Sequence, residues 1–202
     1  MNLIERVKNI LVTPKAEWEK INGEEQSLAS LATGYILPLA IVGAVCAFIG
    51  YGLIGFDTGF LGIKIKGTNW GLYEAISRLA SALIGFIISS YVIDALAPTF
   101  KSEKNINKSA QLMAYSATAS LVGSVFLILP SLAILALLCG LYGVYIMYLG
   151  IGPLKKTPED QKIVYMIVAL VVYIVIAGVL LYIFHKILGS VFNVGLSNFS
   201  LG

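Results

Sequence analysis

Three ionisable side chains lie inside long apolar stretches of this chain: Glu74, Arg78 and Asp94. A charge in such a place is costly, and it usually has a partner or serves a path for ions or substrate. Glu74 and Arg78 stand four residues apart, the spacing that lets an ion pair form on one face of a helix. We predict a structural pair near the membrane surface, with contact to a substrate as the alternative.

Asp94 lies three residues before Ala97 and close to Pro98, which is expected to end the helix. At 1.5 Å per residue, about 30 Å of helix separates it from Glu74, so the two cannot form a catalytic carboxylate pair. We expect Asp94 to bind a Lys or Arg from a neighbouring loop. The alternative is a proton acceptor in a transport pathway.

Sequence motifs of enzymes are missing from the chain. It has no HExxH, no GxSxG, no glycine-rich phosphate loop and no paired aspartates in separate apolar stretches. With one histidine and no CxxC, a zinc site has no support. We therefore predict no enzyme activity, no cofactor and no metal. Cys46 and Cys139 are expected to be free thiols, and the sequence leaves open whether they touch.

Five apolar stretches must position these side chains. Each reaches the roughly 20 residues that a membrane-crossing helix needs. Only 12% of the chain is charged, against about 25% in a soluble domain. We predict an all-α membrane protein, a bundle of five transmembrane helices in one domain over 28–187. The expected spans are 28–53, 73–97, 109–129, 131–152 and 163–187.

The basic residues predict the orientation. Alternate crossings place ten of the 14 Lys and Arg residues on the side of the N-terminus. These are Arg6, Lys8, Lys15, Lys20, Lys101, Lys104, Lys108, Lys155, Lys156 and Lys162. Positive charge stays on the cytoplasmic side, so we expect the N-terminus inside and the tail 188–202 outside. We interpret the basic residues as topology signals and contacts with the lipid bilayer, and we expect no binding of nucleic acid.

Residues 1–27 precede the first span as a cytoplasmic lead. In NLIERVKNILV the apolar residues share one helical face, which predicts an amphipathic helix lying on the membrane surface. Trp18 is expected at the interface. The lead either orients the first span, the interpretation we favour, or docks a partner through Arg6, Lys8 and Trp18.

Small polar residues repeat every four positions in two spans. They are Ser77, Ser81, Gly85 and Ser89, followed by Ser116, Ser120 and Ser124. We expect packing seams between helices, with the lining of a pore as the alternative.

Two proline positions predict local structure. Pro130-Ser131 is expected to join the third and fourth spans in a tight hairpin, with a re-entrant pair as the alternative. Thr157 is expected to cap the last helix, with Pro158 at its first position.

Four segments resemble the Yip (Ypt-interacting protein) domain family: PKAEWEKI, YILPLAIVGA, SYVIDALAPTF and LYGVYIMYLGIGPLKKTPEDQKIVY. The resemblance covers roughly Ile36 to Phe184. It implies five spans, a cytoplasmic N-terminus and a non-cytoplasmic C-terminus, the same layout as the charge count. Eukaryotic relatives bind Rab-type GTPases with the help of a longer N-terminal region. The 27 residues here argue against that partner and resemble short bacterial members. No catalytic residues are associated with the family.

We therefore expect a non-enzymatic adaptor, scaffold or accessory subunit of the bacterial cytoplasmic (inner) membrane. It would act through helix contacts and its basic face, with a protein partner or as a homo-oligomer. The alternative is a small transporter or channel that uses Glu74, Arg78, Asp94 and the serine-lined helix faces.

Overall fold

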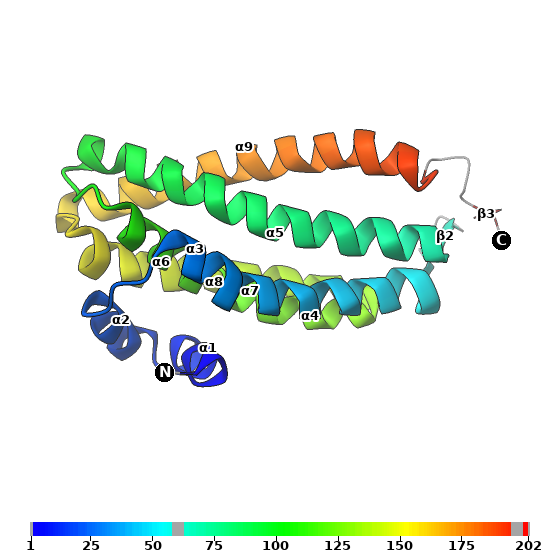
Figure 1. Ribbon diagram of the computed structural model, residues 1–202, viewed down its shortest axis with the longest axis horizontal. Helices are drawn as coiled ribbons and strands as arrows, with labels where there is room; N and C mark the ends of the chain where they lie inside the picture. The colour runs from blue at the N-terminus through cyan, green and yellow to red at the C-terminus, as the bar shows by residue number, and fades with distance from the viewer. Residues whose placement is uncertain (1, 58–62, 195–199, 202) are drawn as a thin grey trace.

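The computed structural model describes residues 2–57, 63–194 and 200–201. It is an elongated helical bundle with two short N-terminal helices at one end and the C-terminus at the other (Figure 1). Five helical stretches in the described residues are long and apolar enough to cross a membrane. The prediction of an all-α membrane protein with five transmembrane helices is confirmed.

The spans are built from helices of different kinds. The first joins α3 (Leu28–Leu31), the π-helix η1 (Ala32–Ile36), α4 (Leu37–Ala47) and the π-helix η2 (Phe48–Ile54). The second joins α5 (Thr68–Leu96) to the 3₁₀-helix η4 (Ala97–Phe100). The third joins α6 (Ile106–Ser116), α7 (Thr118–Gly123) and the 3₁₀-helix η5 (Ser124–Ile128). The fourth is α8 (Ala133–Lys155) and the fifth is α9 (Glu159–Val191).

Three short strands lie at the C-terminal end of the bundle (Figure 1). They are β1 (Phe56–Asp57), β2 (Ile63–Ile65) and β3 (Ser200–Leu201), in the antiparallel order β1-β2-β3. Phe56 pairs with Ile65, and Ile63 pairs with Leu201. The sheet therefore ties the chain between the first two spans to the C-terminal tail.

The third and fourth spans form a helical hairpin. Leu129 is extended, and the 3₁₀-helix η6 (Pro130–Leu132) carries the chain into α8. Helices α7 and α8 then pack against each other along the hairpin. Proline begins the turn because its fixed φ suits the first position of a helix and its missing N–H costs nothing there.

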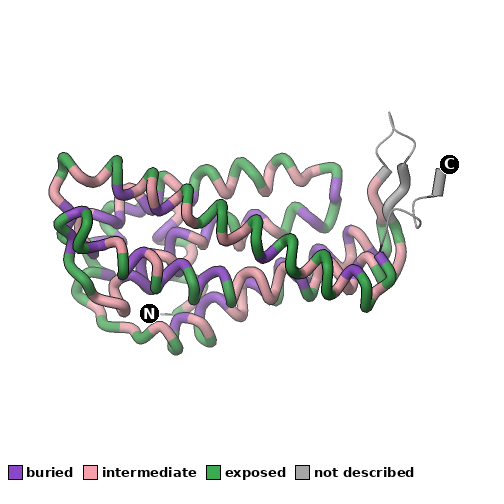
Figure 2. The backbone as a smooth tube through the Cα atoms, turned by 90° about the horizontal axis from the view of Figure 1, so that it is seen from above, coloured by how far each residue is buried: buried purple, intermediate pink, exposed green. Residues whose placement is uncertain are grey.

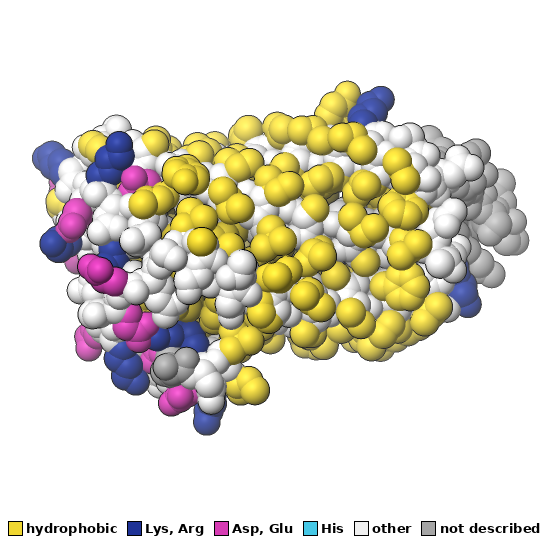
Figure 3. Space-filling view, viewed as in Figure 1, with side chains coloured by type: hydrophobic (Ala, Val, Ile, Leu, Met, Phe, Trp, Pro, Cys, Tyr) yellow, Lys and Arg dark blue, Asp and Glu magenta, His cyan; other side chains and the backbone are white. Residues whose placement is uncertain are grey.

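Charged side chains gather at one end of the molecule, over the N-terminal helices and the loops before α6 and α9 (Figure 3). A wide apolar surface covers the middle of the visible face, as a protein immersed in lipid requires. We call the end with the charged side chains the charged end. The opposite end, which carries the sheet, is the far end.

The two ends are packed to different degrees. The main cluster of buried apolar residues lies in the half near the charged end (Figure 2). In the most apolar stretch of α9, by contrast, only 11% of the residues are buried within the chain. Helix α9 packs along α5 and to a lesser extent along α8. Most of its surface is therefore left for lipid or for another protein.

The N-terminal lead forms two helices, α1 (Leu3–Val12) and α2 (Pro14–Asn22), which dock on the bundle (Figure 1). Trp18 is fully buried, and its Nε1 donates a hydrogen bond to the Ile146 carbonyl at 3.0 Å. Ile10 and Ile21 are also fully buried. Protein thus covers part of the apolar face of the lead, whereas we had expected that face to lie on the membrane surface; Ile4 and Val12 of α1 do remain exposed.

Gly150 makes the docking of Trp18 possible. A Cβ added at Gly150 would lie 2.6 Å from Trp18 Cε2 and 2.8 Å from Leu112 Cδ1. We expect Gly150→Val to push Trp18 out and to lower the free energy of unfolding by about 1–3 kcal/mol. Thermal melting in detergent and a red shift of Trp18 fluorescence, with Trp70 replaced by Phe, would measure both effects.

Gly140→Val is the matched control, because it lies on the same helix and, apart from that helix's own backbone, no described atom lies within 4 Å of an added Cβ. Equal melting temperatures for the two variants would contradict this account of the docking.

Candidate functional site

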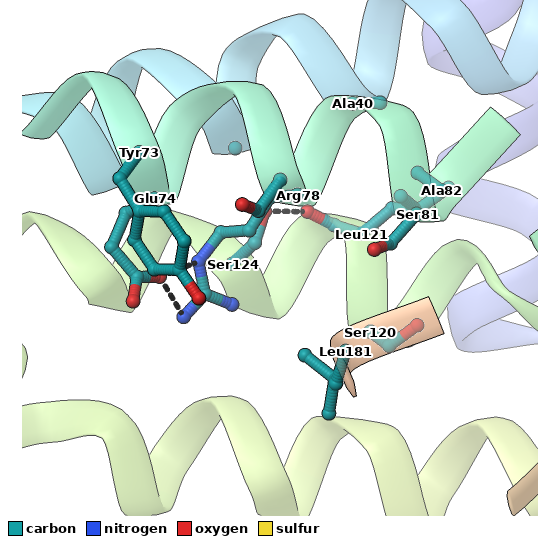
Figure 4. Close-up of a pocket in the computed structure, with 12 residues that line it drawn as sticks. Ala40, Tyr73, Glu74, Arg78, Ser81, Ala82, Ser120, Leu121, Ser124 and Leu181 are labelled. Atoms are coloured by element: carbon teal, nitrogen blue, oxygen red, sulfur yellow. Dashed lines mark hydrogen bonds and ion pairs between the residues drawn. The ribbon is translucent and has the colours of Figure 1, made fainter. Parts of the chain in front are cut away.

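A cavity of about 300 Å³ opens in the far half of the bundle (Figure 4). Four of the five spans contribute to its wall: α4, α5, the third span and α9. The wall combines one carboxylate, one guanidinium, four serines and several apolar side chains. The members used below are Glu74, Ser77, Arg78, Ser81, Ser124 and Leu181.

Glu74 and Arg78 form an ion pair on successive turns of α5 (Figure 4). Arg78 Nε donates to Glu74 Oε2 at 3.0 Å, and Arg78 Nη2 lies 2.9 Å from the same oxygen. The Arg78 side chain is 39% exposed and that of Glu74 is 20% exposed. The pair is therefore reachable from outside the cavity, and it stands about 9–15 Å from the start of α5 at 1.5 Å per residue.

The two serine stripes meet at this cavity. Ser77 and Ser81 come from α5, and Ser120 and Ser124 come from the third span. Ser120 and Ser124 donate to carbonyls of their own helical turns, those of Ala117 and Leu121. Among the described residues, the Oγ atoms of Ser77 and Ser81 find no hydrogen-bond partner. The stripes pack helices only in part, because four of their hydroxyls line a hollow.

Close packing does occur at the edge of the cavity. A Cβ added at Gly43 of α4 would lie 2.2 Å from Ser124 Oγ. The absence of a side chain at Gly43 therefore lets the first and third spans approach each other beside the cavity.

Asp94 lies in a different place, in a buried cluster at the charged end. Its Oδ1 is 3.2 Å from Lys155 Nζ, and it accepts a hydrogen bond of 3.1 Å from Ser109 Oγ. Lys155 Nζ also donates to Ser109 Oγ at 2.6 Å and to the Asn105 carbonyl at 3.4 Å. The cluster joins α5, α6 and α8. The partner was expected in a loop, but Lys155 is the last residue of α8 and has no exposed surface.

Further hydrogen bonds join neighbouring elements at the charged end. Tyr165 of α9 donates its hydroxyl proton to the Ile93 carbonyl at 2.6 Å. Ser102 and Thr157 share a hydrogen bond of 2.8 Å between their hydroxyls. The prediction that Thr157 caps α9 is wrong, because its hydroxyl instead reaches Ser102 and the Ile151 carbonyl, and Pro158 stands at the cap.

An exposed ion pair borders this cluster. Lys156 Nζ lies 2.6 Å from Glu103 Oε2, and this contact lowers the pKa of the Glu103 carboxyl. The Glu103 backbone N–H also donates to the Lys155 carbonyl at 2.7 Å. The loop before α6 is therefore held against the end of α8.

Two of the three docking candidates are not on the surface. Arg6 is only 4% exposed and binds Glu17 at 2.7 Å and Glu24. Its guanidinium also lies over the Tyr115 ring, 5.1 Å from the centroid. Trp18 is buried as described above, and only Lys8 remains exposed. The helical period of the apolar residues in α1 was identified correctly. A helical period alone could not show that protein would bury Ile10, or that Arg6 would be buried in ion pairs with Glu17 and Glu24.

Other groups offer less chemistry. Cys46 and Cys139 are free thiols. Among the described residues, no three His, Cys, Asp or Glu side chains come together as metal ligands. The chemistry that the arrangement supports is the reversible binding of a polar or charged group in the far half.

Replacing Asp94 tests whether the cluster at the charged end is structural. Asp94→Asn leaves the buried Lys155 ammonium without an anion, so we expect a loss of about 3–5 kcal/mol in the free energy of unfolding. Denaturation in mild detergent would measure it. Glu103→Gln breaks the exposed pair with Lys156 and should change stability little.

The double variant Asp94→Asn/Lys155→Met should recover part of the loss, because no charge then remains buried. A stable Asp94→Asn variant would contradict the structural role and return Asp94 to the candidates for proton transfer.

Comparison with known proteins shows what the chain is similar to. The model of the Yip1 domain matches residues 8–189. Inner membrane protein YohC of Escherichia coli K12 is 25% identical over 177 residues, which cover 83% of this chain and 88% of that protein. Inner membrane protein YohC of Escherichia coli O6:H1 matches to the same extent. No solved structure matches the chain. Since the domain match spans nearly the whole chain, the protein belongs to the Yip1 domain family.

Proposed function

We propose that this protein is a non-enzymatic adaptor or accessory subunit that presents a fixed charged surface at one side of the membrane. One observation carries the proposal: α1 and α2 are locked to the bundle by the buried Arg6 and Trp18. Lysines on the outside of these helices, Lys8, Lys15 and Lys20, are consequently held in place. A preorganised surface loses less entropy when a partner binds.

Further hydrogen bonds support this rigidity. Lys108 Nζ donates to the carbonyls of Asn22 at 2.6 Å and Glu24 at 2.8 Å. Gln111 Nε2 donates to the Glu24 carbonyl at 3.1 Å. The chain between α2 and α3 is thus fastened to α6, which keeps α2 in a constant position relative to the spans.

We place the protein in the bacterial inner membrane, with the charged end and the N-terminus in the cytoplasm. The names of the Escherichia coli relatives support the membrane. The gathering of basic residues at one end supports the orientation, because positive loops stay cytoplasmic.

In-cell photo-crosslinking tests the adaptor role. A crosslinking amino acid at Lys8 or Lys15 should capture one protein partner in stoichiometric amount, because both positions lie on the fixed surface. Mass spectrometry would identify it. The charge reversals Lys8→Glu and Lys15→Glu should reduce capture of a partner that binds through this surface.

The matched control places the same crosslinker at Lys186, an exposed lysine near the far end. The same products from both ends, or lipid alone, would contradict the adaptor role. Capture of a second copy of the chain would show self-assembly at this surface.

A small transporter or channel is the second candidate, and the polar cavity favours it. Glu74, Arg78 and the serines do lie together, as such a role requires. Asp94 does not join them, since it is about 30 Å away along α5. A path would have to continue past the Asp94 cluster and the buried core at the charged end.

Transport makes a separate prediction. Proteoliposomes should show a solute or ion flux above that of empty vesicles, and Arg78→Gln should reduce it because the cavity loses its cation. Asp94→Asn, checked for folding, should reduce it only if the path reaches the charged end. A flux equal to that of empty vesicles under every gradient would reject this candidate.

A further inference from the structure

The cavity in the far half continues into an apolar one. A second hollow of about 150 Å³ shares Ser81 and Leu181 with it and is otherwise lined largely by apolar residues of α9, including Ile176 and Leu180. Helices α5 and α9 run side by side along this part of the bundle (Figure 1). The two hollows together offer a polar place next to an apolar groove, which fits a molecule with a polar head and a hydrocarbon chain.

We propose that this site binds one phospholipid whose headgroup carries both a phosphate and an ammonium, with its phosphate on Arg78 and its ammonium on Glu74. This inference goes beyond the adaptor role and does not depend on it. A volume of 300 Å³ holds about ten water molecules at roughly 30 Å³ each. It therefore admits a headgroup, while the acyl chains would lie along α5 and α9.

Arg78 retains donors for a phosphate. Its contacts with Glu74 use Nε and Nη2, and both end on the same carboxylate oxygen. The guanidinium has five N–H donors in a planar fork, which suits the oxygens of a phosphate. Since both contacts use Oε2, Arg78 leaves Glu74 Oε1 open to accept from an ammonium, as far as the described residues go.

Ser77 gives an independent indication of a ligand. This serine is only 6% exposed, it lines the cavity, and its Oγ has no hydrogen-bond partner among the residues that the structure describes. Buried hydroxyls in proteins nearly always have a partner, because a lone one loses its bonds to water without replacement. A phosphate oxygen seated on Arg78 would supply an acceptor in the same cavity.

The balance of charge favours a headgroup with both signs. The cavity wall has one negative and one positive side chain, so its formal charge is zero. A headgroup that is only anionic would meet Arg78 but would also face the Glu74 carboxylate. A zwitterionic headgroup satisfies both.

Native mass spectrometry of the full-length protein in detergent would test the proposal. After delipidation, the protein is titrated with phosphatidylethanolamine, phosphatidylglycerol or soluble phosphoethanolamine. We expect each chain to bind one phosphatidylethanolamine tightly, to bind phosphatidylglycerol more weakly and to bind little phosphoethanolamine. Arg78→Gln should lower the affinity for phosphatidylethanolamine by about tenfold, because it removes a charge-assisted hydrogen bond.

Two comparisons separate a specific site from damage to the fold. Lys186→Gln removes the same charge at an exposed position of α9 near the same end and should leave binding unchanged. Glu74→Gln should lower the affinity for phosphatidylethanolamine, because the partner of the ammonium is lost. It should raise the affinity for phosphatidylglycerol, because the repulsion of an anionic headgroup disappears. A misfolded variant would lose both lipids.

Three results would overturn the proposal. Equal binding of both lipids by the natural chain would remove the role of the ammonium. Binding of phosphoethanolamine as tight as that of the lipid would show a site for a soluble phosphate ester. Lipid binding unchanged in Arg78→Gln and Glu74→Gln would show only lipid attached to the general apolar surface.

Discussion

The buried ion pair between Asp94 and Lys155 is the contact on which the charged end depends. It joins α5 to α8, and Ser109 adds α6 through hydrogen bonds to both partners. Charges removed from water lose their hydration, and only good geometry and further hydrogen bonds offset that loss. Three spans must therefore keep a fixed separation, since a small displacement would leave a charge unpaired.

The other contacts at this end follow the same principle. Arg6 is buried against Glu17 and Glu24, which fixes α1 on α2 and both on the chain leading to the first span. Trp18 fills the space that Gly150 leaves on α8, and its N–H finds the Ile146 carbonyl. The Arg6 guanidinium and the Trp18 N–H are thus matched where water is excluded, and the lead becomes part of the folded domain.

The far half is organised differently. Its serines sit where helices could pack closely, yet within the described part of the chain the hydroxyls of Ser77 and Ser81 have no partner beside the Glu74–Arg78 pair. Helix α9 contributes Leu181 to the wall of this region and packs mainly on α5. A firm base at one end and a polar hollow at the other suit a protein that keeps its shape while it binds something in the membrane. The proposed adaptor surface and the proposed lipid site can thus coexist.

Hydropathy and local spacing in the sequence determined the five spans, the hairpin at Pro130 and the ion pair of Glu74 with Arg78. These features depend on residues within a few turns of each other, where the helical period is enough. Only the tertiary structure decided that Asp94 meets Lys155, 61 residues away, and that Trp18 meets Ile146, 128 residues away. It also decided that protein covers Ile10, Trp18 and Ile21 of the lead and that the two serine stripes line one cavity. Helical periodicity shows which side chains share a face, but the packing of whole helices decides what that face meets.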